Sequence, residues 1–168
     1  MTNQFVLLLL ASALLMGCRS LPSNDAPIRT PDPTPAITSS TASMGEEIAL
    51  RALALVGKPY RYGGADLLGF DCSGLVYFIH QGVGIPVPRT AADQQRAAMS
   101  IARAALRPGD LLFFKTTSST RISHVGVYVG ESRFVHAPAT GKLIEVRTLN
   151  DLYYGPRLVA SGRLHPDS

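Results

Sequence analysis

Between residues 45 and 165 the helical patterns come first and the strand patterns follow. Apolar residues repeat at helical spacing over 46–56, residues 72–81 are typical of a buried helix, and residues 90–99 form a short amphipathic pattern. Five short apolar segments with strand character come next, separated by turn residues: 111–114, 125–129, 134–137, 143–146 and 158–162. Strands joined by short turns pair antiparallel, so this order predicts an α+β domain in which N-terminal helices pack on an antiparallel β-sheet.

Residues at the ends of the helical segments support these boundaries. Gly57 follows the first segment as a C-cap, and Gly82 and Gly84 end the second. Thr90 precedes the third segment and Asp93 lies three residues later, which is typical of a capping box. Apolar residues in the Gly-rich stretch 58–70 do not repeat at helix or strand spacing, so this stretch is expected to be irregular.

The first 44 residues differ in composition from the domain that follows them. Residues 5–16 form an apolar run that is too short to span a membrane and is typical of a signal-peptide core. Pro, Ser, Thr and Ala then prevail up to Met44 with no apolar period, which predicts an extended tether. The chain therefore divides into a signal peptide at 1–17, a tether at 18–44 and a globular domain at 45–168.

The two cysteines of the chain, Cys18 and Cys72, have unlike surroundings. Cys18 ends the apolar run, whereas Cys72 opens the predicted buried helix in the sequence Asp71-Cys72-Ser73-Gly74. A disulfide is the simplest interpretation of two cysteines in an exported chain, but these surroundings favour two separate roles. A helix N-terminus stabilises a thiolate, so Cys72 is a candidate nucleophile. A cysteine that only packs at the helix start is the alternative.

Two histidines lie on a predicted hairpin whose loop is Gly130-Glu131-Ser132. A three-residue loop places His136 opposite Gly126 and on the same face as His124, whereas a two-residue loop puts the histidines on opposite faces. In the first register Gly126 leaves room between the rings. Cys72, His124 and His136 then serve as nucleophile, general base and orienting group. For either histidine alone, a hydrogen-bonded strand residue is the alternative.

Charge and ligand spacing exclude other classes of function. The net charge is +4, but the basic residues are scattered rather than clustered, which argues against a nucleic-acid partner. A zinc site would have only Cys72, His124 and His136 as ligands, with no closely spaced pair among them. We therefore expect neither a metal nor a cofactor.

Together these motifs resemble the NlpC/P60 family of cysteine peptidases over nearly the whole domain. The resemblance rests on motifs in a fixed order: Gly57-Lys58-Pro59-Tyr60-Arg61-Tyr62-Gly63-Gly64, Asp71-Cys72-Ser73-Gly74, Pro88-Arg89-Thr90 with Gln94, Arg107–Phe114, His124–Tyr128 and His136-Ala137. It implies a papain-like core that cleaves peptide bonds in peptidoglycan stem peptides without a cofactor. By the same resemblance Cys72, His124 and His136 are the catalytic triad.

The resemblance also assigns residues around the nucleophile. Tyr60 resembles the family tyrosine that helps to shape the oxyanion region. Asp71 and Ser73 resemble positions that bind a free α-amino group of the stem peptide in some members, although a helix cap explains both almost as well. Arg89 borders the expected substrate groove. Tyr153 and Tyr154 are expected in the core or in the groove wall.

The sequence Leu15-Met16-Gly17-Cys18 resembles the bacterial lipobox, in which the cysteine is lipidated and becomes the mature N-terminus. Arg19, rather than Asp, follows it, which in Gram-negative lipoproteins implies delivery to the outer membrane. One departure is residues 1–4, which carry no Lys or Arg. We therefore expect a lipid anchor on Cys18 that holds the domain at the periplasmic face of the outer membrane, with peptidoglycan as its partner.

Two other functions are compatible with this fold. One is a non-catalytic lipoprotein that binds wall peptides, and the other is an acyltransferase or amidase that uses the same thiolate chemistry. The intact Cys72, His124 and His136 set and the tether favour the wall peptidase. Members of the family cut either the D-glutamyl–diaminopimelate link or the D-alanyl–diaminopimelate cross-link, and the sequence is compatible with both, with or without a protein regulator.

Overall fold

The computed structural model describes residues 42–117 and 120–166. The predicted signal peptide, Cys18 and nearly all of the predicted tether therefore lie outside the described residues. Among the residues that are described, no helix has both the length and the apolar character needed to cross a membrane.

The first helix, α1 (Met44–Ala54), begins two residues earlier than the pattern predicts. Ser43 is its N-cap and forms a capping box with Glu46, a cap that was not predicted from the apolar pattern. Gly57 lies beyond the end of the helix with φ of +88°, a left-handed conformation that favours glycine, and its N–H donates to the carbonyl of Ile144.

The second helix, α2 (Cys72–Gln81), has the predicted bounds, with Asp71 as its N-cap. The third, α3 (Ala91–Ala97), starts after Thr90 as predicted but ends before Met99, because the chain turns into a short strand there. The Thr90 side chain accepts the Asp93 N–H and donates its own hydroxyl to the Asp93 carboxylate. Thr90 and Asp93 thus form one half of the predicted capping box.

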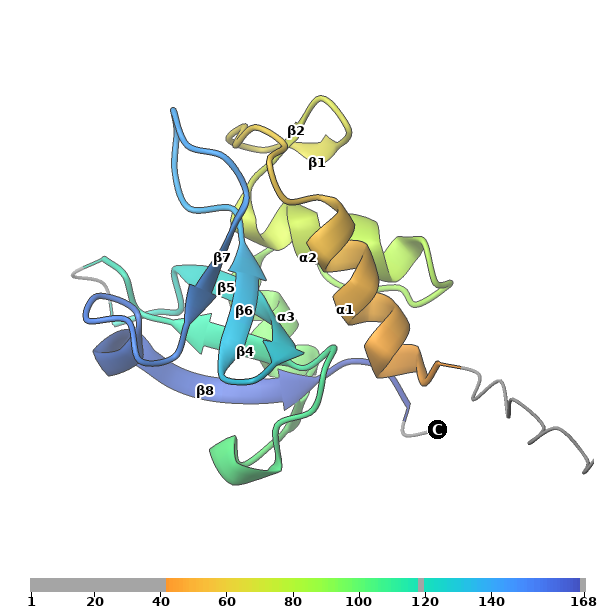
Figure 1. The fold of residues 1–168 in the computed structure, drawn as a ribbon, viewed down its shortest axis with the longest axis vertical. Helices are drawn as coiled ribbons and strands as arrows, with labels where there is room; N and C mark the ends of the chain where they lie inside the picture. Colours follow the sequence, from red (N-terminus) through yellow and green to blue (C-terminus); the bar gives the residue numbers. More distant parts are fainter. Residues whose placement is uncertain (1–41, 118–119, 167–168) are drawn as a thin grey trace, which may run out of the picture. The chain divides into compact units, whose positions relative to one another are not determined.

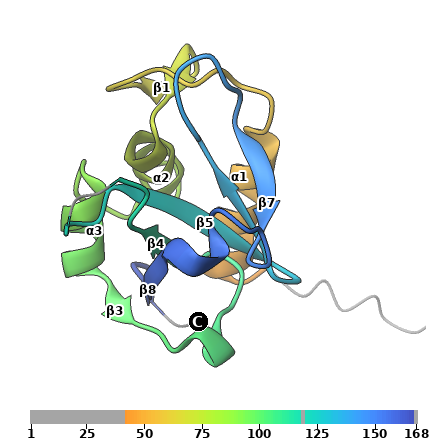
Figure 2. The same ribbon diagram turned by 90° about the vertical axis from the view of Figure 1, so that its left-hand side faces the viewer.

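Six antiparallel strands form the main sheet in the order β3-β8-β4-β5-β6-β7 (Figure 1; β3 is labelled in Figure 2). Their bounds are β3 (Met99–Ser100), β4 (Leu111–Phe114), β5 (His124–Gly130), β6 (Arg133–His136), β7 (Glu145–Thr148) and β8 (Leu158–Arg163). All five predicted strands are present, but β7 starts two residues later than predicted because Leu143 pairs with Pro59 instead. Within the stretch predicted to be irregular, β1 (Ala65–Asp66) and β2 (Gly69–Phe70) form a small hairpin.

Apolar side chains cover both faces of the sheet. Helices α1 and α2 lie side by side and pack against β5, where Ile48, Leu75 and Val125 belong to one core cluster (Figures 1 and 2). The opposite face carries a second, aromatic-rich cluster: Leu112, Phe114, Phe134, Leu149 and Tyr154. Two short 3₁₀ helices, Arg103–Ala105 and Gly155–Arg157, lie in the connections. The domain is thus α+β with helices on an antiparallel sheet, as predicted.

The hairpin between β5 and β6 has the register that places His124 and His136 on one face, but its loop differs from the predicted one. Its turn has two residues, Glu131 and Ser132, both with left-handed φ of +51° and +57°. The pairing shifts by one residue between Tyr128 and Gly130, which is a β-bulge. This extra residue restores the pairing of Val127 with Val135, so that Gly126 faces His136 and the two histidines share a face.

Candidate active site

Cys72 is the first residue of α2 and has a free thiol. The irregular segment before α2 brings Tyr60 and Asp71 to the same place, and the segment before α3 brings Arg89. With Ser73 these residues line a pocket of about 520 Å³. The structure therefore groups five predicted site residues around one opening, although they are up to 29 positions apart in the sequence.

His124 and His136 form a buried pair on the adjacent strands β5 and β6. Nε2 of His124 lies 2.8 Å from Nδ1 of His136, which is hydrogen-bond distance, and the two rings are nearly perpendicular at 88°. The pair is surrounded by the rings of Phe114, Phe134 and Tyr154, at centroid distances between 4.6 and 6.0 Å. These ring contacts restrict the orientation of both imidazoles.

The strand that carries His124, β5, also influences the pKa of the Cys72 thiol through its backbone. The backbone N–H of Val125, the residue after His124, favours the thiolate form of Cys72 over the thiol, as do the N–H groups of Ser73 and Cys72. These three donors lower the pKa of the thiol. Burial and the neighbouring Asp71 carboxylate outweigh them, so the pKa of Cys72 is raised above its ordinary value.

Both histidines are neutral at physiological pH. Burial, followed by the charge of His136, lowers the pKa of His124 to about 3. Burial, followed by the positive charge of Arg147, lowers the pKa of His136 to about 3. A neutral thiol and a neutral imidazole are therefore the resting forms, and the arrangement is suited to proton transfer at the moment when the sulfur attacks.

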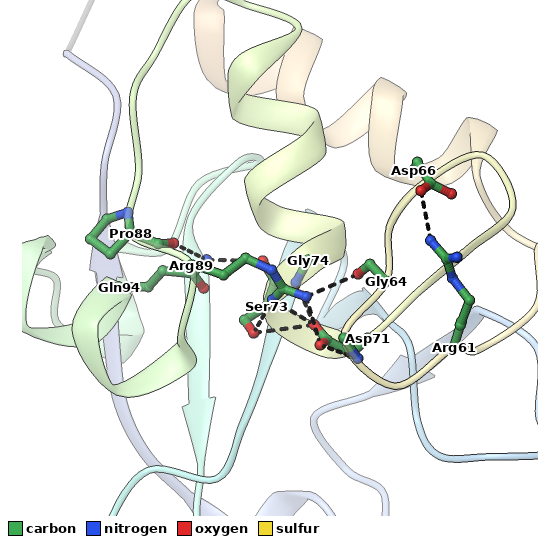
Figure 3. A network of polar contacts seen from close by, with 10 residues as sticks. Arg61, Gly64, Asp66, Asp71, Ser73, Gly74, Pro88, Arg89 and Gln94 are labelled. Carbon is green, nitrogen blue, oxygen red and sulfur yellow. Dashed lines mark hydrogen bonds and ion pairs between the residues drawn. The ribbon is translucent and has the colours of Figure 1, made fainter.

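Asp71 is the centre of a polar network beside Cys72 (Figure 3). Arg89 donates to both carboxylate oxygens, at 2.9 and 2.7 Å, and also to the Ser73 hydroxyl and the Gly64 carbonyl. The N–H groups of Gly74 and Gly63 and the Ser73 hydroxyl complete five donors to one carboxylate. Burial alone would raise the pKa of Asp71, but Arg89 and the other donors lower it below its usual range.

The same network fixes the start of α2. Gln94 of α3 donates from Nε2 to the carbonyls of Ser73 and Pro88, which joins α3 to α2. Gly74 lies so close to the Gly64 carbonyl that a Cβ atom there would be 1.9 Å from its oxygen. Only glycine fits at this position, which explains the Gly of the Asp71-Cys72-Ser73-Gly74 motif.

Tyr60 lines the same pocket as the candidate nucleophile, Cys72. Its N–H donates to the Lys142 carbonyl, and its ring lines the Cys72 pocket. Burial, then the charges of Cys72 and Asp71, raises the pKa of its hydroxyl. The hydroxyl thus stays protonated near neutral pH and is available as a hydrogen-bond donor beside the sulfur.

Glu145 was not identified from the sequence and lies directly behind the histidine pair. It is the cross-strand partner of His136, and its Oε1 is 3.5 Å from His136 Nε2, a buried nitrogen that has no hydrogen bond within the described residues.

Tyr154 was expected in the core or in a groove wall, and it belongs to both. Its ring packs on His136, and it lines a second pocket of about 520 Å³ together with His124. Within residues 42–117 and 120–166 no three His, Cys, Asp or Glu side chains are grouped as metal ligands.

The fold and this arrangement place the chain in a known class of proteins. The profile of the NlpC/P60 family matches residues 57–163, which span every described residue of the site. The chain belongs to the NlpC/P60 family.

Named relatives and a solved structure are similar to this chain. Murein DD-endopeptidase MepH of Escherichia coli (strain K12) is 43% identical over 113 residues, which is 65% of this chain and 42% of MepH. Gamma-D-glutamyl-L-lysine dipeptidyl-peptidase of Bacillus subtilis (strain 168) is 38% identical over 137 residues, or 81% of this chain and 46% of that protein. An NlpC/P60 family protein from Bacillus cereus ATCC 10987 has a similar structure, with a TM-score of 0.69 at 28% identity over 73% of this chain and 40% of that one. The chain thus spans less than half the length of these relatives.

Proposed function

We propose that this protein is a cysteine peptidase that cleaves peptide bonds in peptidoglycan. The observation that carries the proposal is the buried pair of His124 on β5 and His136 on β6, with Nε2 of His124 2.8 Å from Nδ1 of His136. The residue that follows His124 on β5, Val125, favours the Cys72 thiolate through its backbone N–H. Relatives named as a murein endopeptidase and as a dipeptidyl-peptidase support peptidoglycan as the substrate class.

The proposed reaction begins when His124 takes the proton of the Cys72 thiol as the sulfur attacks a stem-peptide carbonyl. His136 holds the His124 ring through the bond to its Nε2, which leaves Nδ1 of His124 for the thiol proton. The backbone N–H of Cys72 and the hydroxyl of Tyr60 donate to the oxyanion. His124 then protonates the leaving amine, and water hydrolyses the acyl-enzyme.

Asp71, Ser73 and Arg89 form the wall of the substrate pocket next to the nucleophile. Because five donors already surround the Asp71 carboxylate, an ammonium group of a substrate would have to compete with Arg89 for it. We assign to the three residues a shared role in holding the first turn of α2, and with it Cys72, in position.

The test is digestion of purified sacculi by the full chain and by its Cys72→Ala variant. Release of new muropeptides by the wild type alone supports the proposal, whereas identical products from both proteins contradict it. Cys18→Ser is the matched control, because it removes the other thiol and should leave the products unchanged. Mass spectrometry of the fragments shows whether the D-glutamyl or the D-alanyl bond of diaminopimelate is cut.

We further propose that Cys18 is lipidated and anchors the protein to the periplasmic face of the outer membrane. The support lies in the sequence, namely the apolar run, the Leu15-Met16-Gly17-Cys18 motif and the Arg19 that follows it. Fractionation of a Gram-negative host should find the wild type in the outer membrane and Cys18→Ala outside it. Equal distribution of the two proteins would argue against the anchor.

A further inference from the structure

A third pocket, of about 770 Å³, opens beside the Cys72 pocket. Its walls come from α3, from the residues after β4, from residues 120–122 and from β8. Thr90, Ala92 and Ile122 line both pockets, so the two are adjacent. A peptide bound at Cys72 can therefore extend into this space.

The pocket has an excess of positive charge. Three cations line it, Arg96, Lys115 and Arg121, against the single carboxylate of Asp93. That carboxylate is already engaged, since it forms an ion pair with Arg96 and accepts the Thr90 hydroxyl. Lys115 is exposed, and its ammonium group makes no hydrogen bond or ion pair with the residues that the structure describes.

The two neighbouring pockets lack this excess. In the Cys72 pocket Arg89 is paired with Asp71. In the pocket beside His124 two cations are matched by two carboxylates: Lys142, Arg147, Glu145 and Asp151. The exposed ammonium group of Lys115 thus adds positive charge on the α3 side of Cys72, where it attracts an anionic group.

We propose that the pocket formed by Lys115, Arg121 and α3 is a substrate subsite that binds a free carboxylate of the peptide being cleaved at Cys72. This inference rests on the proposed peptidase function, whose substrate, the stem peptide, carries several carboxylates. Ala92, Val159 and Ala160 also line the pocket, and its volume leaves room for a peptide branch. The subsite thereby selects peptides that carry a carboxylate over peptides in which that group is amidated.

The test compares synthetic cross-linked stem peptides in which one free carboxylate at a time is replaced by a carboxamide. For one position, amidation should lower kcat/KM of the full wild-type chain about fivefold, as expected for an exposed ion pair. The loss should lie mainly in KM, because the contact is remote from the reacting atoms. The preference should also weaken as the salt concentration rises.

Substitutions assign the preference to the pocket. The double variant with Lys115→Gln and Arg121→Gln should cleave the peptide with the free carboxylate and its amidated form at similar rates. The variant Lys115→Glu should prefer the amidated form. Lys58→Gln with Arg103→Gln is the matched control, because it removes the same two residue types outside the pockets and should keep the wild-type preference. Circular dichroism melting checks that the variants remain folded.

The outcomes separate this inference from the function on which it rests. Wild-type cleavage with no sensitivity to amidation at any position overturns the subsite and leaves the peptidase intact. The same holds if the Lys115 and Arg121 variants keep the preference, or if the Lys58 and Arg103 control loses it. If the wild type cleaves none of the peptides and releases nothing from sacculi, the peptidase function fails and the subsite fails with it.

Discussion

Cys72 and His124 are uncharged at rest for the same physical reason. Burial disfavours a thiolate and an imidazolium alike, and it is the largest influence on both groups. The backbone donors of Val125 and Ser73 favour the thiolate but do not overcome burial and Asp71. In the proposed mechanism His124 therefore activates Cys72 during the attack, and the two residues do not form a thiolate–imidazolium pair beforehand.

Alkylation tests this state of the thiol. We expect iodoacetamide to modify Cys72 more slowly at pH 7 than it modifies a free cysteine, with the rate still rising above pH 9, because the raised pKa leaves little thiolate. Peptide mapping by mass spectrometry follows Cys72 separately from Cys18. A rate that is already maximal at pH 6 would indicate a thiolate–imidazolium pair instead.

In the proposed mechanism Glu145 influences Cys72 through His136 and His124. Its Oε1 lies 3.5 Å from Nε2 of His136, so the carboxylate favours the tautomer that carries the His136 proton on Nε2. Nδ1 of His136 is then the acceptor for the N–H of His124. In the proposed mechanism Glu145 is thus a positioning residue, because it sets the direction of the hydrogen bond between the two histidines.

Glu145→Gln should lower kcat about tenfold and leave KM unchanged, since it removes the charge that favours one tautomer and keeps the size of the side chain. Steady-state kinetics on a soluble stem peptide measures both constants. Glu145→Asp should recover part of the lost kcat. Arg147→Gln is a useful comparison, because Arg147 pairs with the same carboxylate but does not touch His136. Equal kcat in Glu145→Gln and wild type would exclude the positioning role.

At the scale of elements, the first turn of α2 depends on a half-buried ion pair. Asp71 is the N-cap of the helix and also pairs with Arg89, whose side chain is more exposed. Figure 3 also shows a second ion pair, Arg61 and Asp66. Its N–O distance of 2.6 Å is similar, but the side chains of both residues are exposed. The two pairs differ mainly in burial, so they form a natural comparison.

Asp71→Asn should destabilise the fold by about 2 kcal/mol, because asparagine still caps a helix but leaves Arg89 without its carboxylate. Urea denaturation of the full chain measures the change in the free energy of unfolding. Asp66→Asn should give no measurable change, since exposed ion pairs contribute little. Similar losses in both variants would mean that burial of the Asp71 pair does not matter.

Local patterns predicted the helices and five strands, because apolar period and turn residues are local properties. Two features of the site could not be derived in this way. The face shared by His124 and His136 depends on a bulge near Val129, and a bulge leaves no sequence signal apart from the loop that it modifies. The pairing of Glu145 with His136 depends on the path of residues 137–144, whose length alone does not fix a register.

For the whole molecule, the buried histidines couple the fold to pH. His80 lies fully buried in α2 with Nδ1 2.9 Å from the Val76 carbonyl, and burial lowers its pKa to about 4. His124 and His136 have pKa values of about 3. All three lie below the value of about 6.5 in an unfolded chain, so the unfolded state binds protons first as the pH falls. Their contribution to stability is complete above about pH 6.5 and is lost progressively as the pH falls towards 3 to 4.

We therefore expect the free energy of unfolding to fall steeply between pH 6 and pH 5, where most carboxylates are still ionised. Uptake of three protons on unfolding corresponds to a slope of about 4 kcal/mol per pH unit. His80→Leu removes one of these protons, and its slope should be about two thirds of the wild-type value. A packing defect caused by this substitution lowers the free energy of unfolding by the same amount at every pH. It therefore leaves the slope unchanged and can be separated from the loss of the proton. Urea denaturation series at closely spaced pH values provide both quantities. Parallel curves for the wild type and His80→Leu would show that His80 takes up no proton on unfolding.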